Sequence, residues 1–223
     1  MNFENLDKMT RRQIVDETGS RSELRIFDWE MLDYANEAVN EACMRGRLLV
    51  DSETTTICRI AVSAGQAVYA YDPRILSIRR ISLASNGKAL KKTVAWELDE
   101  KYPLWDAMTG AVDHIVTGMD REKIRLFKIP TEADTLKLTV VRLPLRELAK
   151  NEDVPEINAR FHRSLILYMK HKAYNNQDSE AFDKNRADVH LQHFESEFGP
   201  KSAAISDVFA EMDFAFQPNR EYF

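Results

Sequence analysis

The 223-residue sequence has only seven glycines, two cysteines and no long hydrophobic run. The glycines supply neither a G-x-G-x-x-G turn nor a Walker phosphate loop, which excludes a nucleotide-driven motor. The cysteines, Cys43 and Cys58, are too few for a disulfide framework and are predicted to be buried thiols in a reducing compartment. Because no segment approaches the roughly 20 apolar residues that cross a bilayer, we expect no membrane contact.

Patterns that indicate catalysis are also scarce. There is no G-x-S-x-G and no H-E-x-x-H motif. His190 and His193 share one face of a predicted helix and are candidate metal ligands, but no third ligand stands at a diagnostic spacing. We therefore predict surface or interface histidines, no metal, no cofactor and no enzymatic activity.

Two alternatives stay open at this point. One is a metal-dependent hydrolase built on His190 and His193. The other is a small-molecule-binding module that holds its ligand between Trp96, Tyr102 and Trp105, although such aromatic residues are more often part of a core.

The charge distribution argues against nonspecific wrapping of nucleic acid, since the formal net charge is −5. Two basic pairs, Arg79-Arg80 and Lys91-Lys92, nevertheless flank Asn86-Gly87, a strong signal for a two-residue hairpin turn. They predict a hairpin that faces DNA or a partner protein, with ordinary strand-surface charge as the alternative.

Helical patterns occupy both ends of the chain. A Thr10–Gln13 capping box predicts a short first helix, and Asp28 is predicted to cap a second one that runs to about Leu49. Pro155 is predicted to open a third helix, and the fourth runs from near Ser179 to Gly199-Pro200. The last two are expected to pair as an antiparallel hairpin.

The middle of the chain alternates with the period of strands, for example at Ile75–Leu83 and Leu136–Leu143. The predicted fold class is α+β, with a helical bundle formed by residues 1–51 and 151–199 and an inserted antiparallel β domain at 52–150. Residues 200–223 form a predicted arm whose aromatic residues are expected to bind a partner. They are Phe209, Phe214, Phe216, Tyr222 and Phe223.

The segment 136–199 resembles the head-to-tail adaptor proteins of tailed bacteriophages, also called connector or head-completion proteins. The resemblance rests on Arg142-Leu143-Pro144, Pro155-Glu156-Ile157, Phe161-His162, Tyr168-Met169, Ala173-Tyr174 and Asp178–Glu180, with a weaker match at Asp72–Leu76.

The resemblance implies a structural virion protein at the head–tail junction, made in the cytoplasm of the bacterial host. It implies a ring of usually about twelve copies between the portal protein and a tail or tail-completion protein, with genomic DNA passing through the channel without sequence-specific binding. A terminal arm would grip the portal, and charged side chains of the last helix pair, Lys170 among them, would contact ring neighbours.

Overall fold

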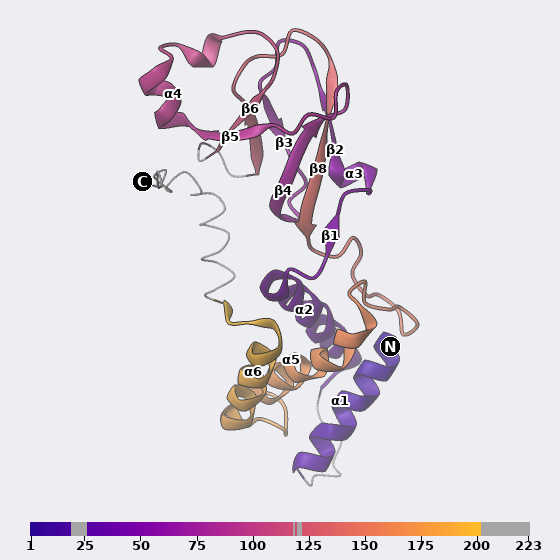
Figure 1. The fold of residues 1–223 in the computed structure, drawn as a ribbon. Coiled ribbons are helices and arrows are strands. Elements are labelled where there is room, and N and C mark those ends of the chain that lie inside the picture. The colour runs from indigo at the N-terminus through magenta and orange to yellow at the C-terminus, as the bar shows by residue number, and fades with distance from the viewer. Residues whose placement is uncertain (19–25, 118, 120–121, 202–223) are drawn as a thin grey trace, which may run out of the picture. The chain divides into compact units, whose positions relative to one another are not determined.

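The computed structural model describes residues 1–18, 26–117, 119 and 122–201 (Figure 1). These residues fall into two compact units. Of the described residues, the helical unit contains Met1–Leu49 and residues 143–201, and the β unit contains Val50–Arg142. The α+β class is confirmed, with helices from both sides of the chain flanking a β region.

The helical unit consists of α1 (Phe3–Thr18), α2 (Asp28–Gly46), the short 3-10 helix η2 (Ala159–Phe161), α5 (His162–Asn175) and α6 (Lys184–Phe198). Its core is one cluster in which each of the four α-helices buries an apolar face. Leu6, Ala35, Leu165 and Phe194 are fully buried and represent these four faces. Because each helix is amphipathic, the tertiary packing of these faces stabilises helices that are short on their own.

Three residues that were predicted to cap or open helices do not have that role, although α2 does begin at Asp28. Thr10 is a buried residue inside α1, where its hydroxyl donates to the Leu6 carbonyl oxygen at 2.7 Å instead of capping the helix. Asp28 is the first residue of α2, and the backbone N–H of Phe27 donates to Glu30 at 2.7 Å. Pro155 precedes α5 without opening it, because Ile157 leaves the helical path to enter the core.

The last helix, α6, agrees more closely with its prediction. Asp183 caps α6 by accepting a hydrogen bond from the Arg186 N–H at 3.1 Å, so the helix begins later than the predicted Ser179. It ends at Phe198, followed by Gly199 with a positive φ of 93°. The predicted stop at Gly199-Pro200 is confirmed, since a positive φ favours glycine after a helix.

The β unit contains two sheets. In the first, β8 (Asp134–Arg142) pairs antiparallel with β1 (Val50–Asp51), β2 (Arg59–Val62) and β4 (Ile75–Leu83). In the second, the order is β3 (Val68–Ala70), β7 (Lys123–Leu126), β6 (His114–Thr117) and β5 (Lys91–Val94). Helices α3 (Thr55–Cys58), α4 (Ala95–Lys101) and η1 (Trp105–Ala107) connect the strands.

The predicted hairpin at Asn86-Gly87 is wrong beyond its turn. Gly87 has the positive φ of 65° that a tight turn requires, and a single bridge joins Ser82 to Ala89. After Leu90, however, the chain leaves β4 and forms β5, which pairs in parallel with β6 of the other sheet. β4 pairs along its length with β8, whose apolar side chains are almost completely buried.

Both cysteines are buried, and neither forms a disulfide. Cys43 lies in α2 as its pattern predicts, whereas Cys58 ends the one-turn helix α3 instead of lying within a strand. Burial, with a smaller contribution from Asp51, raises the pKa of the Cys58 thiol to about 11. Such a thiol stays protonated at neutral pH and is chemically inert.

Candidate functional site

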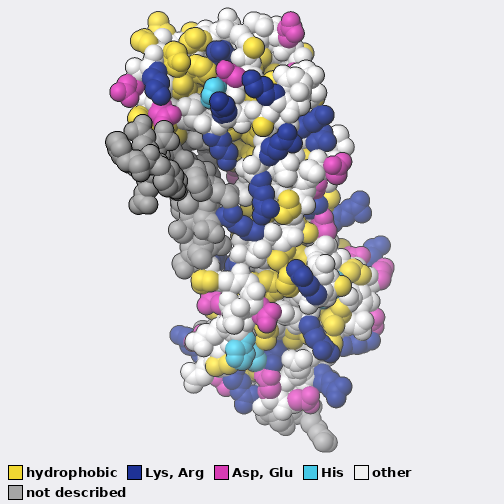
Figure 2. Space-filling model, viewed as in Figure 1, with side chains coloured by type: hydrophobic (Ala, Val, Ile, Leu, Met, Phe, Trp, Pro, Cys, Tyr) yellow, Lys and Arg dark blue, Asp and Glu magenta, His cyan; other side chains and the backbone are white. Residues whose placement is uncertain are grey.

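The two basic pairs lie on different sheets of the β unit, and their side chains are exposed. Arg79 and Arg80 belong to β4, and the Arg80 guanidinium donates to the Gly87 carbonyl oxygen at 3.3 Å. Lys91 and Lys92 belong to β5, and the Lys92 ammonium donates to the Ile78 carbonyl oxygen at 3.4 Å. The crossover between the sheets therefore holds the pairs close together, and Figure 2 shows Lys and Arg side chains gathered over this unit.

A cavity of about 360 Å³ opens beside β5. We call it the basic cavity because four lysines and one histidine line it against two carboxylates. Its lining residues are Lys91, Lys92, Thr93, Glu97, Leu98, Lys101, Tyr102, Met108, Asp113, His114, Phe127 and Lys128.

Neighbouring groups engage both carboxylates of the basic cavity. Asp113 lies 3.0 Å from His114 Nδ1 and 3.9 Å from the Lys128 ammonium. Burial alone would raise the pKa of Asp113, but His114 and Lys128 outweigh it and hold the pKa below its usual value. Glu97 accepts a hydrogen bond from the Thr93 hydroxyl at 3.2 Å. The cavity therefore keeps a positive balance at neutral pH.

The aromatic residues of the alternative ligand module do not enclose one space. Trp105 is a core residue whose indole N–H donates to Asp99 at 2.7 Å, whereas Trp96 is exposed. Tyr102 alone lines the basic cavity, where its ring is 45% exposed and lies 5.6 Å from the Phe127 ring.

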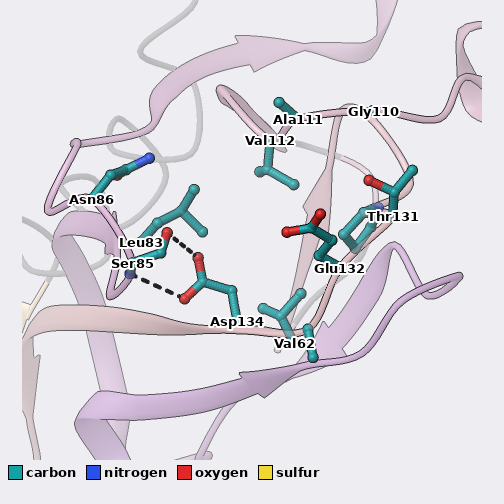
Figure 3. Close-up of a pocket in the computed structure, with 12 residues that line it drawn as sticks. Val62, Leu83, Ser85, Asn86, Gly110, Ala111, Val112, Thr131, Glu132 and Asp134 are labelled. Carbon is teal, nitrogen blue, oxygen red and sulfur yellow. Dashed lines mark hydrogen bonds between the residues drawn. The ribbon is translucent and has the colours of Figure 1, made fainter.

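A second cavity of about 290 Å³ lies beneath the turn that follows β4 (Figure 3). Val62 and Leu83 form apolar parts of its wall, and the Asp134 carboxylate accepts hydrogen bonds from the Ser85 N–H and hydroxyl at 3.2 and 2.6 Å. The Glu132 carboxylate points toward the open space in Figure 3. No Lys, Arg or His lines it, so its polarity is opposite to that of the basic cavity.

His190 and His193 do not form a paired ligand set. His190 is buried against Tyr174, with parallel rings 5.5 Å apart, and its Nε2 lies 3.1 Å from a Glu17 carboxylate oxygen. His193 is exposed, with its ring centroid 6.3 Å from that of His190. In the described part of the chain, no three His, Cys, Asp or Glu side chains are placed to hold a metal ion.

Glu17 is the centre of a polar network that joins α1 to α5 and α6. Its carboxylate pairs with Lys170 and accepts a hydrogen bond from the Tyr174 hydroxyl at 2.6 Å. Burial alone would raise the pKa of Glu17, but hydrogen bonds from Lys170, Tyr174 and His190 outweigh it and lower the pKa. Lys170, which the ring hypothesis places on an outer face, is therefore a buried residue that holds helices together.

An exposed aromatic pair lies at the start of α2 and was not predicted from the sequence. Phe27 and Trp29 are 64% and 62% exposed, and their rings stack at 6.2 Å with an angle of 11° between planes. The two aromatic residues stand on either side of Asp28, the first residue of α2. Large exposed aromatic surfaces commonly mark protein interfaces.

The five aromatic residues predicted to bind a partner lie outside the described residues. They are Phe209, Phe214, Phe216, Tyr222 and Phe223. Among the helices that the structure describes, none has both the length and the apolar character to cross a membrane.

Comparison with known proteins agrees with the resemblance carried by the last helix pair. The family model described as SU10 adaptor protein matches residues 1–213, which include both units. A search of curated proteins finds no match. Since the matched region covers nearly the whole chain, the protein belongs to the SU10 adaptor family, a family of phage head-to-tail adaptors and structural virion proteins.

Proposed function

We propose that this adaptor assembles as a ring of about twelve copies between the portal protein and the tail or tail-completion protein, with the genome passing through the channel. The observation that carries the proposal is membership of the adaptor family over residues 1–213. In this proposal the protein acts by binding other proteins and performs no catalysis.

Ring assembly needs two different complementary surfaces on each copy, because ring contacts are heterologous. The stacked Phe27–Trp29 pair is suited to one of them, since exposed aromatic side chains supply most of the energy of many interfaces. The distribution of charged residues along the chain supports a second contact between ring neighbours. Residues 50–142 carry 14 Lys and Arg against 12 Asp and Glu, whereas the rest of the chain carries 17 against 24. A basic surface of one copy therefore has acidic counterparts on its neighbour.

The aromatic segment near the C-terminus is proposed as the contact with the portal. Deleting residues 202–223 removes Phe209, Phe214 and Phe216 together with Tyr222 and Phe223. We expect the four helices to keep their core, because the core residues that the structure describes all lie outside the deleted segment. We expect portal binding to be lost while the melting temperature stays unchanged, and unchanged binding would refute this part of the proposal.

Negative-stain electron microscopy of the purified protein mixed with the portal of the same phage tests the proposal as a whole. Rings that cap the portal are the expected result, and the protein alone serves as the control. Absence of association with a correctly assembled portal would overturn the proposed placement between head and tail. A Phe27→Ala/Trp29→Ala variant tests the ring contact, and Phe182→Ala is its control because that ring is also exposed.

A further inference from the structure

The basic cavity has the features of a polyanion site, and none of them follows from family membership. Lys91, Lys92, Lys101 and Lys128 come from three separate segments of the β unit and line one space. Lys91, Lys92 and Lys101 have exposed side chains, so their ammonium groups remain available to a ligand from solution. Concentrating like charges in this way costs repulsion, which an anionic ligand relieves.

The carboxylates that line the cavity leave most of this charge in place. Asp113 is held by His114 and Lys128, as described above, and Glu97 is oriented by Thr93. Of the four ammonium groups, only Lys128 lies within 4.0 Å of one of these two carboxylates. The three other lysines therefore contribute the net positive charge.

An aromatic ring stands beside these cations. Tyr102 is 45% exposed, and its ring centroid lies 5.6 Å from that of Phe127, which also lines the cavity. Bases stack on such rings in proteins that bind single-stranded nucleic acid, while lysines attract the phosphates. The volume of about 360 Å³ lies within the range of small-ligand sites and suits one nucleotide unit.

We propose that the basic cavity binds the phosphate backbone of nucleic acid, with Lys91, Lys92 and Lys101 at phosphate oxygens and the Tyr102 ring against a base. The contact is independent of base sequence, because lysines act on phosphates as point charges. It is also weak at high salt, since the affinity of such sites comes from the release of counterions. The inference does not depend on which proteins the adaptor joins.

Fluorescence anisotropy with a labelled oligonucleotide, single-stranded and duplex, tests the proposal over a range of about 50 to 200 mM salt. The cavity variant is Lys91→Gln/Lys101→Gln. The control is Lys88→Gln/Lys137→Gln, which removes the same charge from exposed lysines of the β unit outside the cavity. We expect the cavity variant to lower the slope of log affinity against log salt by about 1.4 for single strands and about 1.8 for duplex. The control should leave the slope unchanged.

Tyr102→Leu tests the stacking contact. We expect a loss of about fivefold or more in affinity for the single strand and a smaller loss for duplex, whose bases already stack on each other. Trp96→Leu is the matched control, because its ring is similarly exposed on α4 but does not line the cavity. Equal losses for the two variants would overturn the role of Tyr102.

Three outcomes would overturn the proposal. They are no binding at the lowest salt, equal effects of the cavity and control variants, and competition by polyglutamate as strong as by an oligonucleotide of equal charge. The last outcome would assign the cavity to an acidic protein. Mass spectrometry of the wild-type protein after lysine acetylation adds a test without substitutions, since an oligonucleotide should protect Lys101 more than Lys137. Portal capping by the cavity variant is measured separately, so the two proposals can fail independently.

Discussion

Replacing Glu17 by Gln tests whether a buried ion pair holds α1 against the rest of the helical unit. The Lys170 side chain is 4% exposed, and Glu17 is the carboxylate that pairs with it. The variant leaves a buried ammonium group without a counter-charge, and removing one partner of a buried pair costs about 3 to 5 kcal/mol. Glu17 itself is 35% exposed, so water reaches part of the site and the lower value, about 3 kcal/mol, is expected.

Urea unfolding followed by far-UV circular dichroism at pH 7 measures this loss of unfolding free energy. Glu37→Gln is the control, because Glu37 pairs with Lys172 of α5 at 2.8 Å in a half-exposed position on α2. An exposed pair of this kind contributes less than about 1 kcal/mol. The reasoning is refuted if Glu17→Gln costs no more than the control.

Three further predictions concern the two cores. Burial lowers the pKa of His190 in the folded protein. As the pH drops through about 6.5, the unfolded chain binds a proton at this histidine before the folded protein does, so stability should fall. The lowered pKa of Glu17 extends the loss to more acidic pH, and urea titrations that show no pH dependence would contradict both. Phe194→Ala should cost about 3 to 5 kcal/mol because the ring is fully buried, whereas the half-buried Phe161 should cost less than half as much in the same assay. Asp51→Asn removes the carboxylate that pairs with the buried Arg142 side chain at 2.7 Å. It should destabilise the β unit by about 3 kcal/mol, measured by unfolding followed by tryptophan fluorescence. A cost below about 1 kcal/mol would speak against a buried pair.

Local patterns in the sequence predict several elements well. The alternation over Ile75–Leu83 reproduces the limits of β4, and Gly199-Pro200 marks the end of α6. Both signals depend on neighbouring residues alone, because a strand's burial period and a helix stop act over a few positions. The start of α1 was missed because Thr10, a good cap by type, lies on the buried face of a helix that had already begun at Phe3.

The basic cavity shows what local sequence patterns fail to predict. The two basic pairs were predicted to meet across a hairpin, and they do lie close together, but β5 belongs to a different sheet from β4. Lys101 and Lys128 were not predicted to belong to the site, since no local sequence pattern indicates that they line the same cavity. The second sheet does so, because β6 pairs with β5 on one side and with β7 on the other, and the residues that follow β5 and β7 line the cavity.

The sequence by itself determined the α+β class, the end of α6 and, through a resemblance in its last helix pair, the adaptor family. These properties follow from residue types at short spacing. Only the tertiary structure decided which charges are buried and which are free. Lys170 and Lys101 look alike in the sequence, yet one is buried against Glu17 and the other lines an open cavity. The difference is set by which helices and strands pack against each residue, and that packing depends on contacts between positions far apart in the chain.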